Sequence, residues 1–569
     1  HLYTGAWSAT AIDTDAGDDV QFFETPQSVY GSIALWQAYD DITEEYAQLA
    51  DDLTNANYAN QEERAQMFAD LLRERFTYSY RVWLVDGKSF SPYDPSVGTA
   101  YDLMAGVDGS WIWPHTLRFD DVEGGLMRMG TNATFNEPIN AIAGSNWAFD
   151  MAWVRATGDY TTVLNPYTGI ALPQRIERAE VTVLSDKPAY QTYDWVDLQF
   201  ADEIVVPEDA IVDYDNETQS WITAGEKWPE GATAIRKSVA YYPEDFWDIQ
   251  YHDGSTIDMA DLLMPWIMTF ERADETSPYY DEAYAATFES AIAPFKGFKI
   301  LSVDPLVYEY YSDYWTLEAE NMVSTLWATY DQNDAGWPII AVSNVGEAAG
   351  TMAYSADKAD ALEIERTGWA VGPTLEILAA DLDALIADPV IPFEGILGEY
   401  LTIDDVVARY ENLKAFYETY GHFVVGTGPI MLTETFPVEQ TLTLSNNPNY
   451  IDNSDKWSLF SAPKLAEVEI DGPGRVSVGA PTTFDVYLTS NGEAYPMNEV
   501  NTVTYLLFSA DGSLVETGDA TPVEDGYYLV ELSEEATGLL EAGACKLEIA
   551  ASVIPVALPA LAAFEFVAE

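Results

Sequence analysis

Cysteine is almost absent from this chain of 569 residues, which contains only Cys545. A single cysteine excludes an internal disulfide framework and any metal site built from several cysteines. Cys545 lies in the apolar, strand-like run 544–550. We therefore expect its side chain to be a small buried hydrophobe.

Basic residues are scarce as well: 25 Lys and Arg stand against 95 Asp and Glu, giving a formal net charge of -70 and a pI near 4.1. Such a polyanion repels phosphate backbones and anionic lipid surfaces, so no nucleic-acid partner is expected. Salt screens the self-repulsion, because the Debye length falls to about 3 Å at 1 M ionic strength. A halophilic source is one hypothesis, and an acidic surface that serves only solubility is the other.

Uninterrupted apolar runs of membrane-spanning length are also missing, so no membrane span is expected. The final run 551–566 is apolar, but Pro555 and Pro559 interrupt it, and it is predicted to form strands rather than an anchor. The sequence begins at His1 without a signal peptide, and we expect this start to be processed or truncated.

Only four histidines are present, His1, His115, His252 and His422, and none lies in a nucleophile motif. The motifs of serine hydrolases, zinc proteases, phosphate-binding loops and dinucleotide-binding loops are absent. We expect no enzymatic activity and no cofactor. A glycosidase with paired carboxylates stays open as an alternative, but 95 acids make some close pair inevitable.

An acidic loop could bind calcium, and two sequons could be glycosylated. Asp13, Asp15 and Asp18 offer oxygen ligands at nearly alternating positions, as a calcium loop would, although the glutamate that closes an EF-hand is missing. The alternative is a solvated acidic loop. Asn132 and Asn216 lie in Asn-x-Thr sequons, which permit glycosylation of a secreted protein.

The residues that are abundant predict an ordinary large globular protein. Hydrophobic residues make up 48% and aromatic residues 13% of the chain, enough for a sizeable core and three or four structural units. Aromatic rings also suit clefts that hold extended ligands. Apolar spacing predicts helices over 42–57, 61–76, 147–155, 259–272, 375–386 and 406–420, and strands over 81–85, 126–129, 177–184, 195–200, 235–242, 423–425 and 440–444.

Four motifs in the middle of the chain are specific. Tyr251-His-Asp-Gly254 begins a run through Leu263 that resembles the Phe-His-Asp-Gly signature of family 5 (oligopeptide/dipeptide) extracellular solute-binding proteins of ABC transporters. The segments 165–169 with 173–177, 426–429 and 446–450 resemble that family's further motifs, in the family's own order.

The resemblance implies an α/β (α+β) fold with periplasmic-binding-protein-like type II lobes. Residues 1–118 resemble the closing part of that fold, a remnant of lobe II that returns to lobe I, and residues 119–465 resemble lobe I with an inserted subdomain. Residues 466–569 contain about seven short β runs separated by turns and are predicted to be an Ig-like β-sandwich. Because the tail of the family fold precedes its head, we expect a permuted fold or a truncated tandem module.

Ligand-binding residues follow from the resemblance, position by position. Thr10 stands where the family has the aspartate that pairs with a peptide's amino group, and Asp13 is a possible substitute. The full set of implied cleft residues is Trp7, Ser8, Ala9, Thr10, Asp13, Thr134, Phe135, Trp147 and Tyr279.

The resemblance implies an extracellular, cell-surface receptor that captures peptides or similar extended solutes by hinge closure and delivers them to an ABC permease. An upstream segment or a companion chain is expected to supply the missing lobe. The alternative from a different class is a cell-surface structural protein, such as a surface-layer or filament subunit, built on the same fold.

Overall fold

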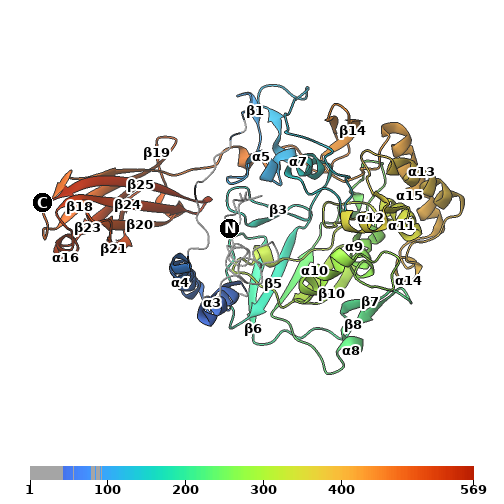
Figure 1. Ribbon diagram of the computed structural model, residues 1–569, viewed down its shortest axis with the longest axis horizontal. Coiled ribbons are helices and arrows are strands. Elements are labelled where there is room, and N and C mark those ends of the chain that lie inside the picture. Colours follow the sequence, from blue (N-terminus) through green and yellow to red (C-terminus); the bar gives the residue numbers. More distant parts are fainter. Residues whose placement is uncertain (1–42, 55–56, 79–83, 85–89, 91) are drawn as a thin grey trace.

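The computed structural model describes residues 43–54, 57–78, 84, 90 and 92–569 (Figure 1). The chain is a mixed α/β protein with helices and multi-stranded sheets, as the sequence predicted. None of the helices in this described part combines the length and apolar character that crossing a membrane requires.

Helices are concentrated before residue 421. The α-helices are α3 (Glu44–Thr54), α4 (Gln61–Tyr78), α5 (Gly106–Gly109), α6 (Trp113–Thr116), α7 (Ala148–Thr157), α8 (Ala224–Lys227), α9 (Met259–Glu271), α10 (Glu282–Ile292), α11 (Trp337–Ala349), α12 (Ala356–Leu362), α13 (Thr374–Ala387), α14 (Glu394–Leu397), α15 (Ile403–Tyr420) and α16 (Glu534–Gly538). Short 3₁₀ turns are η1 (Phe246–Asp248), η2 (Glu320–Met322), η3 (Ser458–Ser461) and η4 (Met497–Glu499).

A seven-stranded sheet forms the centre of the larger part, with the strand order β6-β5-β9-β11-β10-β7-β8. Its members are β5 (Arg178–Leu184), β6 (Val196–Ala201), β7 (Ile211–Asp215), β8 (Ser220–Thr223), β9 (Arg236–Tyr241), β10 (Phe295–Val303) and β11 (Leu306–Ser312). Only β5 and β6 run parallel; the other neighbours are antiparallel.

Helix α9 covers this sheet because nearly every side chain of the helix is apolar, the pattern of a buried helix. The ring of Trp266 lies 5.0 Å from the rings of Phe295 and Phe298, between centroids. Helices α11, α13 and α15 share the same core with α9. Asp258 caps α9 and accepts hydrogen bonds from the N–H groups of Ala260 and Asp261.

Small two-stranded sheets surround this core. They pair β1 (Val97–Gly98) with β2 (Arg118–Phe119), β3 (Thr162–Leu164) with β4 (Ala171–Pro173), β12 (Met352–Ala353) with β13 (Glu365–Arg366), and β14 (Ile430–Phe436) with β15 (Thr441–Asn446).

Ten strands build the C-terminal part, which lies to one side of the larger part (Figure 1). One sheet has the order β16-β18-β23-β22, with β19 beside β18, and the other has the order β17-β25-β24-β20-β21. The strands are β16 (Glu467–Asp471), β17 (Arg475–Val476), β18 (Thr482–Ser490), β19 (Glu493–Ala494), β20 (Val500–Phe508), β21 (Leu514–Asp519), β22 (Thr521–Glu524), β23 (Tyr527–Leu532), β24 (Gly543–Val553) and β25 (Val556–Ala568).

The two C-terminal sheets face each other across a common core. Phe484 of β18 packs against Phe564 and Phe566 of β25, with ring centroids 5.7 and 5.5 Å apart. Cys545 is buried in β24, as predicted. The N–H of Ala557, at the start of β25, donates to the carbonyl of Tyr167 in the larger part (2.9 Å), so this hairpin touches the larger part directly.

Two predicted strands are wrong. Residues 126–129 lie in an extended stretch without a strand partner in the described part of the chain, and Leu126 is 67% exposed. Residues with a high strand propensity form a β-strand only where a neighbouring strand can pair with them. Residues 423–425 are buried but form no ladder, because Phe423 donates its N–H to a loop carbonyl, that of Trp369. The predicted strand 81–85 lies almost entirely outside the described residues.

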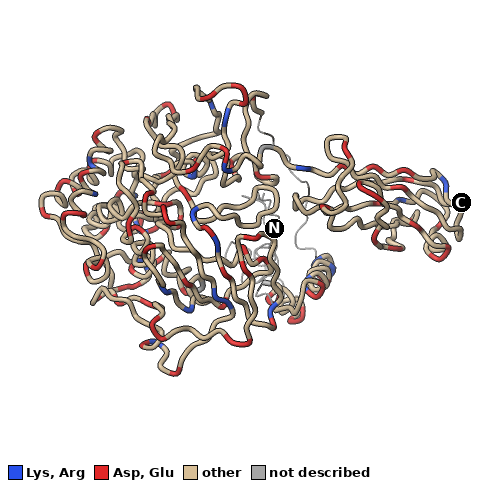
Figure 2. The backbone as a smooth tube through the Cα atoms, turned by 180° about the vertical axis from the view of Figure 1, so that it is seen from behind, with Lys and Arg blue, Asp and Glu red and all other residues tan. Residues whose placement is uncertain are grey.

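Acidic residues are spread along the whole backbone of both parts, and Lys and Arg are sparse among them (Figure 2). The negative charge is therefore distributed along the described chain rather than concentrated in one segment.

Candidate functional site

Three of the four specific sequence motifs meet at one place, which we call the motif junction: the turn 251–254, the run 426–429 and the segment 446–450. The N–H of His252 donates to the carbonyl of Gly426 (2.9 Å). Asn447 donates its side-chain amide to the carbonyl of Gly428 (3.0 Å) and its N–H to the carbonyl of Pro429 (2.8 Å). His252 and Gly426, which are 174 residues apart, are thus directly hydrogen-bonded.

The side chain of His252 is a neutral imidazole that hydrogen-bonds to both glycines of the run 426–429. Gly426 donates its N–H to Nδ1 (3.3 Å), so Nε2 carries the ring proton and donates to the carbonyl of Gly428 (3.1 Å). Burial lowers the pKa of His252 to about 4. The half-buried His115 and the buried His422 have pKa values lowered to about 4, mainly by desolvation, so these three rings are uncharged at neutral pH.

Glycine is required at two junction positions because the end of α7 lies directly against them. A Cβ atom on Gly426 would lie 2.0 Å from the carbonyl oxygen of Thr157, and one on Gly428 would lie 2.5 Å from that of Gly158. Gly428 donates its N–H to the carbonyl of Thr157 (3.0 Å). Only hydrogen side chains allow this approach of two backbones.

A small cavity of about 20 Å³ adjoins the junction, a volume that accommodates one water molecule. Asp334 lines it. Its Oδ2 accepts hydrogen bonds from the Thr427 hydroxyl (2.8 Å) and the Asp159 N–H (3.3 Å), while Oδ1 is buried with no partner among the described residues. Burial raises the pKa of Asp334 to about 7, so the neutral acid is stabilised there.

Next to the junction lies a buried charge cluster centred on Arg175, which we call the Arg175 cluster. The guanidinium contacts Asp159 (2.5 Å) and Asp452 (2.8 Å) and donates to the Tyr450 hydroxyl (2.5 Å). Its side chain is only 5% exposed. Tyr450 is also within hydrogen-bonding distance of His115 Nδ1 (3.1 Å). The cluster therefore ties together the regions around residues 115, 159–175 and 450.

The ionisation of the Arg175 cluster follows from its pairing. Burial alone would lower the pKa of Arg175, but Asp159, Tyr450 and Asp452 raise it above its usual value. Burial alone would raise the pKa of Asp452, but Arg175 and Lys456 lower it. The cluster is a fixed set of charges whose partners are one another, which is the pattern of a structural clamp.

A second buried arginine fixes the start of α9. Arg409 of α15 contacts Asp258 (2.6 Å) and Asp261 (2.9 Å), both in the motif that carries the family resemblance. Burial and the charge of Asp261 raise the pKa of Asp258 to about 6. This motif therefore positions a helix rather than presenting side chains to a ligand.

Three of the predicted ligand-contact residues lie together around Asp150 of α7. The Thr134 hydroxyl and the Phe135 N–H donate to Asp150 Oδ1 (3.1 and 2.8 Å), so the predicted contacts to ligand backbone are used within the chain. Trp147, at the start of α7, is 48% exposed and donates its indole N–H to Glu137 (3.1 Å). Of the three, Trp147 alone presents a large surface to solvent.

The other predicted site residues are dispersed or lie outside the described residues. Tyr279 packs against Phe393, with ring centroids 5.9 Å apart, at a distinct part of the core. Seven predicted positions lie outside the described residues: Trp7, Ser8, Ala9, Thr10, Asp13, Asp15 and Asp18. Calcium binding by those aspartates therefore stays a prediction. In the described part of the chain, no group of three or more His, Cys, Asp or Glu side chains is arranged to hold a metal ion.

The two sequons differ in their surroundings. Asn132 lies in an exposed stretch, whereas the amide of Asn216 donates one of its N–H groups to the Thr276 hydroxyl (2.8 Å).

Sequence reasoning missed three acidic residues in and beside the junction, namely the buried Asp159 and Asp334 and the half-buried Asp452. Nothing in the sequence distinguishes these three from the other acids, because their burial depends on segments far away in the chain. The available signal was the pair Arg175 and Tyr450, which lie in the motif segments 173–177 and 446–450 and contact Asp159 and Asp452.

Comparisons with known proteins add little. No family model and no curated protein matches this chain. Among solved structures, it is similar to a CARDB domain from Pyrococcus furiosus in complex with di-metal ions (16% identity, TM-score 0.14, covering 19% of this chain and 90% of that chain). It is also similar to a superoxide reductase from Ignicoccus hospitalis (13% identity, TM-score 0.14, covering 19% of this chain and 82% of that chain). A third similar structure is a bacterial ice-binding adhesin (11% identity, TM-score 0.14, covering 19% of this chain and 33% of that chain). At these TM-scores the likenesses indicate neither a fold nor a function for this chain.

Proposed function

We propose that this chain is an extracellular solute-binding protein of an ABC importer that captures peptides or similar extended solutes by hinge closure. The observation that carries the proposal is the motif junction. Two segments resembling family 5 solute-binding proteins, 251–254 and 426–429, hydrogen-bond to each other through His252, Gly426 and Gly428, although His252 and Gly426 are 174 residues apart. The third segment, 446–450, follows the β14–β15 hairpin and returns to the same run through Asn447. Chance similarities have no reason to converge in space.

The proposal includes a finer description of the fold. The larger part would be built of periplasmic-binding-protein-like type II lobes, and the two facing C-terminal sheets would be an Ig-like sandwich that acts as a spacer or docking module. An upstream segment or a companion chain would supply the rest of the second lobe. The partner at the membrane would be an ABC permease, and the chain would carry out no chemistry.

The test is ligand-dependent stabilisation of the full chain. A ligand that binds only the folded state raises the unfolding temperature by mass action. We expect a pool of short peptides to raise the melting temperature, and native mass spectrometry to identify the retained species. Thr10→Asp, which restores the carboxylate that the family uses, is expected to strengthen the binding of peptides with a free amino group.

The matched control for that test is the same peptide pool with acetylated amino termini, which Thr10→Asp is not expected to favour. A chain that neither retains nor is stabilised by any peptide, with or without the upstream segment, would contradict the receptor function.

The net charge of -70 favours a second candidate, a cell-surface structural subunit. Carboxylates at this density bind divalent cations and cross-link neighbouring molecules. Light scattering separates the two functions: a structural subunit assembles when calcium is added and ignores peptides, whereas a receptor stays monodisperse.

A further inference from the structure

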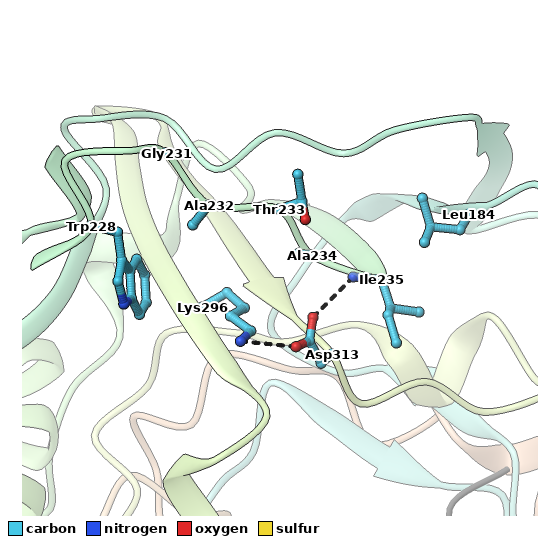
Figure 3. Close-up of a pocket in the computed structure, with 9 residues that line it drawn as sticks. All are labelled: Leu184, Trp228, Gly231, Ala232, Thr233, Ala234, Ile235, Lys296 and Asp313. Atoms are coloured by element: carbon cyan, nitrogen blue, oxygen red, sulfur yellow. Dashed lines mark hydrogen bonds and ion pairs between the residues drawn. The ribbon is translucent and has the colours of Figure 1, made fainter. Parts of the chain in front are cut away.

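A separate open hollow of about 500 Å³ lies beside the seven-stranded sheet, at the end where the loop 228–235 leaves α8 (Figure 3). One side is that loop, with Trp228 at its start. The other side carries Lys296 of β10 and Asp313, which follows β11. In Figure 1, α8 lies at the opposite edge of the larger part from β14, so the hollow is remote from the motif junction.

The polar floor of the hollow is a preformed ion pair. Lys296 Nζ lies 2.9 Å from Asp313 Oδ2, and the N–H of Ile235 donates to Asp313 Oδ1 (3.2 Å). The two side chains are 26% and 38% exposed, so each keeps hydrogen-bonding capacity toward the hollow. A donor and an acceptor are thus fixed side by side, with no net charge.

The aromatic wall of the hollow is Trp228, which is half-buried and packs against the small apolar cluster beneath the loop. Two ammonium groups already lie near its ring: Lys227 Nζ at 5.6 Å and Lys296 Nζ at 5.9 Å from the centroid. Lys227 is paired with Asp213 (2.8 Å) and Lys296 with Asp313 (2.9 Å), so the surroundings of the ring carry no net charge. The wall therefore favours an uncharged, amphipathic surface.

We infer that this hollow binds a neutral carbohydrate, one or two pyranose rings in size. A pyranose presents an apolar C–H face that matches an indole ring. Its neighbouring hydroxyls each donate and accept hydrogen bonds, which matches the adjacent Asp313 carboxylate and Lys296 ammonium. The net charge of the molecule disfavours acidic sugars, and the volume of the hollow lies in the range of small-ligand sites. This inference is independent of the proposed receptor function.

The experiment is a titration of the full chain with neutral sugars, namely glucose, galactose, mannose and N-acetylglucosamine and their disaccharides, followed by saturation-transfer NMR and calorimetry. We expect at least one sugar to bind. Trp228→Ala and Asp313→Asn should each weaken its binding by about ten-fold or more, equivalent to about 1.4 kcal/mol. Trp228→Tyr should retain most of the affinity because a flat aromatic face remains.

Trp247→Ala is the matched control, because Trp247 is another half-buried tryptophan, in η1 and outside the hollow. It should leave sugar affinity unchanged. If Trp228→Ala does not fold, Asp313→Asn and Lys296→Gln provide the same test from the floor of the hollow. Absence of binding by every sugar overturns the inference, as does binding that survives all the hollow variants.

Discussion

At the scale of single residues, the ionisation of Asp334 makes the stability of the folded chain depend on pH. Its pKa is raised to about 7 in the folded state, against 3.8 for an ordinary aspartate, so the folded chain binds this proton more tightly than the unfolded chain does. The stabilisation from the proton is fully present below about pH 4 and is lost as the pH rises through 7. At about 1.4 kcal/mol per pKa unit, the total is on the order of 4 kcal/mol.

Asp334→Asn should therefore remove this pH dependence. The amide keeps an oxygen for Thr427 and Asp159 and places an N–H where Oδ1 has no partner. We expect the variant to be more stable than the wild type at pH 8, by about 1–4 kcal/mol, and the difference to shrink toward pH 5. Chemical denaturation of both proteins across this range measures it. A difference that does not vary with pH contradicts the assignment.

Arg175 supports a second prediction. Arg175→Met leaves the fully buried Asp159 carboxylate without its cation, which should cost about 3–5 kcal/mol. The release of Tyr450 and Asp452 should also expose the segment 450–461 to proteases. Arg175→Lys is the control that keeps the charge but loses the bidentate fork, and it should be intermediate. Equal stability of all three proteins would show that the cluster is not a clamp.

At the scale of elements, the contact between α7 and the run 426–429 is set by glycine. Gly426→Ala places a methyl group 2.0 Å from the Thr157 carbonyl oxygen, so the two backbones must separate and the His252 hydrogen bonds must break. We expect a loss of stability of about 2 kcal/mol or more. Gly130→Ala, where the new Cβ meets nothing within 4 Å, should change stability by less than about 0.5 kcal/mol. Thermal unfolding of the two variants provides the comparison.

Elements with strong local signals were predictable from the sequence. Helix α9 begins after its Asp258 cap, and β5, β6 and β9 coincide with the predicted strands to within one residue at each end, because capping and side-chain alternation are local properties. The sheet order was not predictable, since β5 lies between β6 and β9 through contacts that no local pattern encodes. Residues 126–129 have the composition of a strand but no neighbour.

The candidate site was predictable only where a motif marked it. The resemblance singled out His252, Gly426 and Asn447, and the structure joins them. Thr134 and Phe135 were expected to contact a ligand; the Thr134 hydroxyl and the Phe135 N–H donate to Asp150 within the chain, and ligand contact by these residues stays a prediction. The environment of Asp334 arises only once distant segments close around it.

At the scale of the whole molecule, the net charge of -70 is spread over both parts of the chain (Figure 2). Self-repulsion of this kind opposes the compact state, and salt reduces it. We expect the melting temperature to rise by several degrees between about 0.1 and 1 M NaCl, as the Debye length falls from about 10 to about 3 Å. Choline chloride at equal ionic strength should give the same rise. A rise with sodium alone would indicate specific ion binding, and no rise would contradict self-repulsion.

The long strand β25 fixes a distance across the molecule. Its first residues touch the larger part at Tyr167 through Ala557, and its last residue precedes Glu569. Thirteen residues of extended chain span roughly 40 Å. A fluorophore on Glu569 and a second one near Tyr167 would therefore sit at a separation suited to energy transfer, and the transfer efficiency would report whether the C-terminal sheets stay docked while the rest of the molecule moves.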